Sequence, residues 1–302
     1  MIRSNINRMN NFLTRTLTGL IFVVLLVGSI VLQSYIFCTV FAIIVAICLW
    51  EFYHLVVSLK EKSHVEKWAG ILSGTYFFLA SYLFVNGNSP IQFFLPYIVY
   101  LIFIIISEIY KNAKNPIANI AYTLMGQIYI VLPFSLFNLF FAPAESEGMG
   151  FIGNSSNLSA AFLSYEYIER AILPLTIFVF IWINDTFAYL FGVTLGKHRL
   201  FERISPKKSW EGFFGGAFMT IVIACICAVY LHQLSTIQWI GYAITVVVAG
   251  TYGDLFESLL KRTVGVKDSG NFLPGHGGIL DRLDSALLAI PASLVYLNMV
   301  TY

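Results

Sequence analysis

The residues best suited to chemistry lie in the second half of the chain, in two acidic groups with helical spacing. The first group has offsets of i, i+3, i+4 and i+7, and its members are Asp254, Glu257, Ser258 and Lys261. In the second group, Asp281 and Asp284 stand at i and i+3. Side chains at these offsets share one face of a helix. Each group therefore presents its carboxylates on one side of a predicted helix.

Carboxylates crowded at the end of an apolar helix repel one another and lose solvation unless a cation lies between them. Oxygen ligands without a His or Cys pattern favour a hard ion, Mg²⁺ or Mn²⁺. The alternative is a set of structural ion pairs with Lys261, Arg262 and Arg282. The spacing alone favours the two interpretations equally.

A glycine-rich segment connects the two groups. It contains Gly265, Gly270, Gly275, Gly277 and Gly278, with Lys267 and His276 among them. Glycine permits close backbone approach and the positive φ angles of anion-binding nests. Basic residues beside such a nest would bind phosphate oxygens. A plain flexible loop is the alternative.

A basic segment precedes these groups. Between residues 196 and 212 it carries Lys197, Arg199, Arg203, Lys207 and Lys208. Anchoring at an anionic membrane surface would explain such residues. The run from Ser205 to Ser209, with two adjacent lysines, is more compact than anchoring requires and suits a polyphosphate. Further upstream, Asn184 and Asp185 stand inside an apolar run, where a charge is costly and usually functional.

The elements that must position these residues are membrane helices. Of the 302 residues, 58% are hydrophobic and only 11% are charged, whereas soluble domains carry about a quarter charged residues. Residues 16–50 contain no charge and would measure roughly 52 Å as one helix, so they predict two spans folded back near Gln33. Further apolar segments cover about 69–86, 91–107, 117–141, 171–192, 213–231, 236–253 and 283–302.

These nine spans predict an all-α, polytopic membrane protein. All 18 Lys and Arg residues except Arg170 then fall on the side of the N-terminus, which the positive-inside rule assigns to the cytoplasm. The polar motifs lie on that same side. We expect one membrane domain over residues 1–302, with an N-terminal transmembrane part (1–170) and a C-terminal catalytic part (171–302).

The stretch 258–284 resembles the signature of phosphatidate cytidylyltransferases, also called CDP-diacylglycerol synthases. It matches that signature at Ser258, Leu260, Lys261, Arg262, Lys267, Asp268, Gly270, Leu273, Pro274, His276, Gly277, Gly278, Ile279, Asp281, Arg282, Leu283 and Asp284. The segments 184–192 and 196–212 also resemble this family. The likeness covers about residues 184–290 and is only one of hydropathy over the first 180.

The resemblance implies a bacterial inner-membrane enzyme that faces the cytoplasm, forms a homodimer, binds no nucleic acid and works in phospholipid biosynthesis. Its substrates would be CTP and phosphatidate, and its cofactor Mg²⁺ or Mn²⁺, with a second cation allowed. The implied metal ligands are Asp254 and Asp281, supported by Asp284 and Asp185. The implied substrate-binding residues are Asn184, Asp185, Ser205, Lys207, Lys208, Lys261, Arg262 and Arg282. Lys267, Asp268 and His276 would complete the catalytic site with Asp254 and Asp281.

Two other functions compete with this one. A CTP-dependent polyprenol or phytol kinase would use the same nucleotide but would transfer its γ-phosphate to an alcohol. A transporter would spread its charges across the spans and would often show an internal repeat. Here the charges gather at one border and no repeat is visible.

Overall fold

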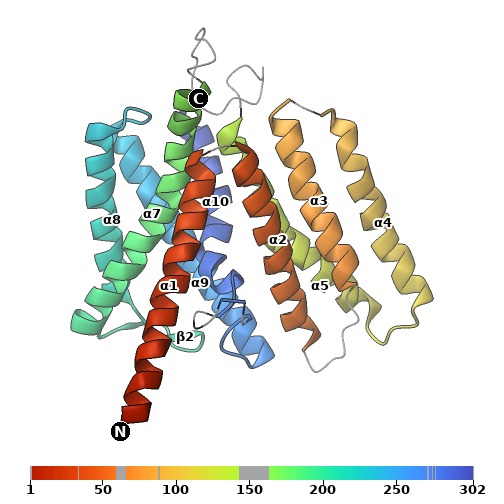
Figure 1. Cartoon of the computed structure of the whole chain (residues 1–302), viewed down its shortest axis with the longest axis horizontal. Helices are drawn as coiled ribbons and strands as arrows, with labels where there is room; N and C mark the ends of the chain where they lie inside the picture. The colour runs from red at the N-terminus through yellow and green to blue at the C-terminus, as the bar shows by residue number, and fades with distance from the viewer. Residues whose placement is uncertain are drawn as a thin grey trace.

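The computed structural model describes residues 2–32, 34–58, 66–87, 89–142, 163–270, 272–273, 275 and 277–301, with side chains described from Arg15 except at residues 163–168 and 301. Within these ranges, nine helices are long and apolar enough to cross a membrane. The prediction of an all-α, polytopic membrane protein is therefore confirmed (Figure 1). The orientation of the N-terminus and the division at residue 170 stay predictions. The loop 143–162 lies outside the described residues.

Five crossings form the N-terminal half. α1 (Ile2–Leu32) and α2 (Ser34–Val57) separate at residue 33, as the length of the uncharged run predicts. α3 (Lys67–Val85) follows, and the 3-10 turn η1 (Ile91–Phe94) leads into α4 (Leu95–Tyr110). The fifth crossing joins α5 (Pro116–Gly126), the π turn η2 (Gln127–Val131), α6 (Leu132–Phe137) and the 3-10 turn η3 (Asn138–Phe141). Its change of helical pitch comes just before Pro133, which has no backbone N–H to continue the hydrogen-bond ladder.

The C-terminal half contributes four crossings and a hairpin that the all-α prediction did not include. α7 (Leu163–Leu195) is followed by the antiparallel strands β1 (Arg199–Phe201) and β2 (Ser205–Ser209). α8 (Trp210–Tyr230), α9 (Thr236–Val264) and α10 (Leu280–Thr301) complete the chain. α9 begins at a capping box of Ser235 and Gln238, and it ends at Gly265, whose φ of 80° suits glycine.

Glycines let these helices approach closely where the polar residues lie. A Cβ on Gly216 of α8 would come within 2.6 Å of Asn184 Oδ1 on α7. A Cβ on Gly253 of α9 would come within 2.5 Å of the Asp284 carbonyl on α10. The backbone around the polar residues is therefore held by helix packing that tolerates no side chain at either glycine.

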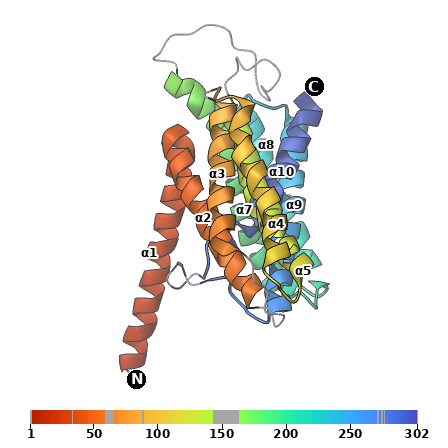
Figure 2. The same cartoon turned by 90° about the vertical axis from the view of Figure 1, so that its right-hand side faces the viewer.

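The polar elements share one end of the bundle. Figure 1 shows the N-terminus at the end that carries strand β2, and the C-terminus at the opposite end, as an odd number of crossings requires. Figure 2 shows α1 running along the outside of the bundle. Several of its large side chains, among them Leu20 and Val24, are exposed and would face lipid.

Candidate active site

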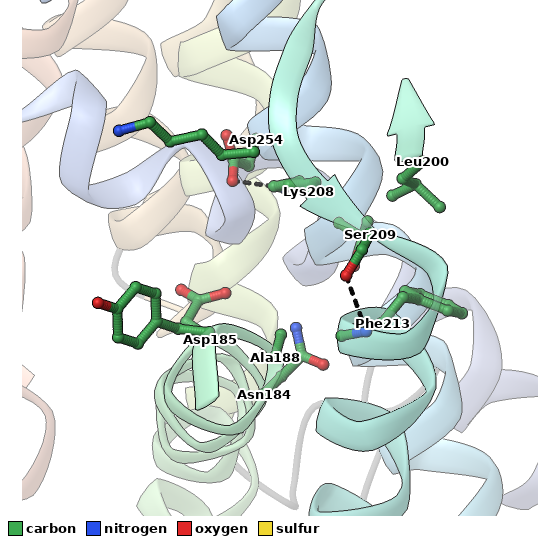
Figure 3. A pocket seen from close by; sticks show the side chains of 12 residues that line it. Asn184, Asp185, Ala188, Leu200, Lys208, Ser209, Phe213 and Asp254 are labelled. Atoms are coloured by element: carbon green, nitrogen blue, oxygen red, sulfur yellow. Dashed lines mark hydrogen bonds and ion pairs between the residues drawn. The ribbon is translucent and has the colours of Figure 1, made fainter. Parts of the chain in front are cut away.

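A pocket at the polar end of the bundle gathers residues from α7, the hairpin, α8 and α9 (Figure 3). Its volume is about 240 Å³, below the roughly 300–1,000 Å³ of typical ligand pockets. The side chains with polar groups that line it are Asn184, Asp185, Tyr189, Lys207, Lys208, Ser209, Thr251 and Asp254. This size and lining suit the phosphate end of a nucleotide better than an entire nucleotide.

An ion pair spans this pocket. Lys208 Nζ of β2 lies 2.5 Å from Asp254 Oδ2 of α9, and both side chains are about one third exposed (28% and 30%). The other oxygen, Asp254 Oδ1, accepts a hydrogen bond of 3.3 Å from Ser258 Oγ. Lys207 also lines the pocket and is exposed. A cationic amine and a carboxylate therefore face the same small space.

α7 supplies two polar residues to the same pocket. Asp185 is exposed there, whereas Asn184 is buried and its Oδ1 has no hydrogen-bond partner among the described residues. Figure 3 shows both residues on the α7 side, with Asp254 and Lys208 across from them. A buried amide oxygen without a partner costs free energy, and a ligand that donates a hydrogen bond would remove that cost.

The hairpin that carries the two lysines is fixed to α8. Ser209 caps this helix, because its Oγ accepts a hydrogen bond of 3.1 Å from Gly212 N. Glu211 accepts hydrogen bonds from the backbone N–H of His198, at 3.1 and 3.2 Å, and its Oε1 lies 2.6 Å from His198 Nδ1. These contacts tie both strands to the first turn of α8 and so set the position of Lys208.

A second polar cluster lies at the start of α10. Asp281 Oδ1 accepts a hydrogen bond of 2.7 Å from Lys261 Nζ, and Lys261 also pairs with Glu257, which is fully buried. Asp281 Oδ2 accepts hydrogen bonds of 2.9 Å from the backbone N–H groups of Ser269 and Gly278. Both oxygens of Asp281 are thus engaged within the protein.

Asp284 connects the two clusters. Its Oδ1 accepts a hydrogen bond of 2.5 Å from Ser285 N, and its carboxylate is near enough to those of Asp254 and Asp185 to be repelled by them. In the part of the chain that the structure describes, no three His, Cys, Asp or Glu side chains meet closely enough to hold a metal ion. Mg²⁺ commonly takes only one or two carboxylates and completes its shell with substrate phosphates and water, so Asp254 and its acidic neighbours fit such an ion.

Several predicted site residues stand apart from the pocket. Ser205 is on β2 but does not line it, and Lys267 and Asp268 are exposed in the loop after α9. Arg262 Nε makes a long hydrogen bond of 3.5 Å to Ile204 O, and Arg282 is exposed. His276 lies outside the described residues.

The glycine-rich segment differs from a phosphate-binding nest at its C-terminal end. The N–H groups of Gly278, Ile279 and Leu280 all donate to carboxylates of the protein itself. Gly277 has a φ of 85° and forms a bridge with Leu273. This part of the segment is therefore neither an open anion cradle nor a flexible loop.

The sequence reasoning missed Glu51 of α2, the acceptor for two of those N–H groups. One signal could have found it. Glu51 is the only Asp, Glu, Lys or Arg between Arg15 and Lys60. A carboxylate inside a span is costly and usually has a specific role, but residue 51 directly follows the uncharged run 16–50 and so fell outside the predicted spans.

Comparison with known proteins connects this geometry to a chemistry. A family model described as the cytidylyltransferase family matches residues 13–300. A phosphatidate cytidylyltransferase of Staphylococcus aureus (strain COL) is 36% identical over 192 residues, which are 63% of this chain and 64% of the relative. One from Staphylococcus saprophyticus is 44% identical over 116 residues, or 38% of this chain and 44% of the relative. The matched part thus spans less than two thirds of these relatives' length.

Proposed function

Since the chain belongs to the cytidylyltransferase family, we propose that it transfers the cytidylyl group of CTP to phosphatidate, releasing pyrophosphate. The observation that carries this proposal is the pocket in which Lys207 and Lys208 face Asp254 and Asp185 at the polar end of a membrane bundle. Such a pocket can hold a polyphosphate beside the head group of a lipid. The relatives named phosphatidate cytidylyltransferase support the choice of substrates.

The reaction balances without a base from the protein. An oxygen of the phosphatidate monoester forms a bond to the α-phosphorus of CTP. The bond between that phosphorus and the oxygen leading to the β-phosphate breaks, and pyrophosphate leaves with the electron pair. A phosphate monoester has a second pKa of about 6, so it is already a dianionic nucleophile near neutral pH.

The protein must bind CTP and phosphatidate, which are both polyanions, with the attacking oxygen in line with the bond that breaks. We assign Lys207 and Lys208 to the phosphates of CTP, with Asn184 donating or accepting a hydrogen bond at the same pocket. Lys261, which pairs with both Glu257 and Asp281, is the cationic side chain of the second cluster. Arg262, Arg282, Ser205, Lys267, Asp268 and His276 remain proposed contributors that would approach once substrate is bound.

We propose Asp254, Asp281 and Asp284 as the ligands of Mg²⁺ or Mn²⁺, with Asp185 as support; because these carboxylates do not converge in the structure, Asp254 would bind the ion first and the others would reach it only after the site rearranges around substrate. The cation would supply charge neutralisation for the leaving pyrophosphate. Lys208 pairs with one oxygen of Asp254, and Lys261 pairs with one oxygen of Asp281. Each lysine neutralises its carboxylate, and each must shift for that oxygen to bind a cation.

An apolar cavity that also borders α9 suits the acyl chains of the lipid. A cavity of about 550 Å³ between α5–α6 and α9–α10 is lined almost wholly by apolar side chains, including Met125, Phe256 and Leu287. Phe256 stands two positions after Asp254 on α9, an offset that places the two side chains on different faces of the helix, so the cavity and the polar pocket lie on different faces of α9. A lipid whose chains enter this cavity would bring its phosphate to the polar end of the bundle. We also propose the bacterial inner membrane, a cytoplasmic active site and a homodimer.

One experiment separates this function from a CTP-dependent lipid kinase. Purified protein is incubated with phosphatidate, a polyprenol, Mg²⁺ and CTP labelled at either the α- or the γ-phosphorus. Cytidylyl transfer puts the α-label into lipid and the γ-label into pyrophosphate. A γ-label in the lipid fraction, or no transfer of either label, would contradict the proposal.

A further inference from the structure

Glu51 is a fully buried carboxylate in the N-terminal half of the chain, far in sequence from the proposed active site. It lies on α2, whose other 23 residues include no Asp, Lys or Arg, and its exposed fraction is 0%. Burying a carboxylate is expensive unless hydrogen bonds or a counter-charge compensate it. The hydrogen bonds that Glu51 accepts therefore indicate its structural role.

Among the described residues, the three groups that donate hydrogen bonds to Glu51 come from the glycine-rich segment and the start of α10. Ile279 N donates to Oε1 at 3.1 Å, and Leu280 N donates to Oε2 at 2.8 Å. Ser269 Oγ donates to Oε2 at 3.4 Å. The first N–H groups of a helix have no partner within the helix, and a negative charge is stabilising there. Glu51 thus caps α10 from another helix.

The neighbouring N–H groups belong to Asp281. Gly278 N and Ser269 N both donate to Asp281 Oδ2 at 2.9 Å. Three successive N–H groups, at residues 278, 279 and 280, are therefore divided between Asp281 and Glu51. The two carboxylates fix one turn of backbone from two sides.

Two glycines leave the space that Glu51 occupies. A Cβ on Gly270 would lie 2.5 Å from Glu51 Oε1, and a Cβ on Gly278 would lie 2.5 Å from Oε2. Both distances are far below a van der Waals contact. The segment therefore wraps the carboxylate with bare backbone, which a general need for loop flexibility would not explain.

We infer that Glu51 is a positioning residue for the proposed transfer reaction: it holds the first turn of α10, and with it Asp281 and Asp284, in the geometry that the reaction requires. This inference rests on the proposed function. Glu51 touches neither substrate nor the reacting atoms. Its effect passes through the backbone at residues 278–280.

The main test is Glu51→Gln, which keeps the size of the side chain but replaces one acceptor oxygen by an NH₂ group. That group would face a backbone N–H that also donates, so one capping bond is lost. We expect kcat to fall about 10- to 100-fold, as for other partners that orient a catalytic ligand, while KM for CTP stays unchanged. Hydrogen exchange should rise at the amides of Ile279 and Leu280.

Two further variants keep the test decisive. Glu51→Asp keeps the charge on a shorter side chain, so its kcat should fall less than that of Glu51→Gln. If the Gln variant does not fold, the kcat of the Asp variant tests the positioning role instead. Glu108→Gln is the matched control, because Glu108 is buried in α4 and bonds to Asn119 (2.8 Å) and Lys111 (3.0 Å). It should leave kcat and exchange at residues 279–280 unchanged.

The outcomes separate the two proposals. Normal kcat in Glu51→Gln, or an equal loss in Glu108→Gln, would overturn the positioning role. An unchanged exchange rate at residues 279 and 280 would overturn the capping on which it depends. If the unaltered protein transfers no cytidylyl group, the proposed function fails, while the exchange measurement still tests the cap.

Discussion

At the scale of single residues, the proposed site is built from carboxylates that already have partners. Asp254 bonds to Lys208 and Ser258, and Asp281 bonds to Lys261 and two backbone N–H groups. The two aspartates differ in their surroundings, since Asp281 anchors a loop and Asp254 lines a pocket. This difference makes the two positions separable by mutation.

Asp254→Asn should abolish most activity and change the dependence on Mg²⁺, with little effect on the melting temperature, because the side chain of Asp254 is 30% exposed. Asp281→Asn should also lower activity but should melt earlier, because breaking a buried pair costs roughly 3–5 kcal/mol. The measurements are activity against Mg²⁺ concentration and a thermal melt in detergent. Normal Mg²⁺ dependence in both variants would refute the metal assignment.

Lys208→Ala should raise KM for CTP. A hydrogen bond to a charged group contributes about 1.5–3 kcal/mol, which corresponds to a roughly 10- to 150-fold loss of kcat/KM. The matched control is Lys197→Ala, which removes an exposed lysine of the same loop that does not line the pocket. An equal effect of both variants would indicate membrane anchoring rather than phosphate binding.

The sequence predicted single residues well only where partners are close in the chain. The i, i+3 and i+4 spacings correctly placed Asp254, Ser258 and Lys261 on one helix, α9. The pairing of Lys208 with Asp254 depends on how β2 lies over α9, and no local pattern specifies that. The bonds from Glu51 to residues 279 and 280 cross more than 220 positions, so they follow only from the packing of α2 against α10.

At the scale of elements, the helices were predictable and the connections between them were not. Long apolar runs gave the nine crossings because a hydrocarbon core imposes a minimum helix length. The two strands of the hairpin, β1 and β2, have only three and five residues. The sequence around them is basic and shows no regular spacing of apolar residues that would predict a strand. The sequence revealed that the segment is rich in glycine, but not that it packs around the carboxylate of Glu51 from α2.

Gly270→Ala tests how tightly that segment closes on Glu51. The added methyl group would meet the Glu51 carboxylate at 2.5 Å, and overpacking of this kind costs about 1–3 kcal/mol. Gly28→Ala in α1 is the control, because its Cβ would make only an ordinary contact of 3.8 Å. A thermal melt should show a loss for the first variant and none for the second, and equal melting would contradict the described packing.

At the scale of the whole molecule, the sorting of basic residues and the placement of the polar elements agree. The N-terminus and the hairpin lie at one end of the bundle, and the C-terminus lies at the other (Figure 1). Which end faces the cytoplasm stays a prediction from the positive-inside rule.

Reporter fusions test that orientation. Fusions after Lys62, Lys114, Arg203 and Lys267 should be cytoplasmic, and those at Asn88, Asn154 and Ser235 should lie on the far side. Lys62, Asn88 and Asn154 lie outside the described residues. A far-side reporter at Arg203 would overturn both the span count and the proposed side of the active site.

The length of α9 has a consequence for where in the bilayer the reaction takes place. This helix has 29 residues, and Asp254 stands 18 positions after its first residue, or about 27 Å along its axis at 1.5 Å per residue. That depth nearly equals the roughly 30 Å of a hydrocarbon core, so a helix that starts at one membrane surface delivers Asp254 to the other. The lipid phosphate can therefore react in the head-group region, where it normally lies, without moving into bulk water or into the hydrocarbon core. Turnover would then be leaflet-selective, and phosphatidate confined to the opposite monolayer would have to flip before it could be used.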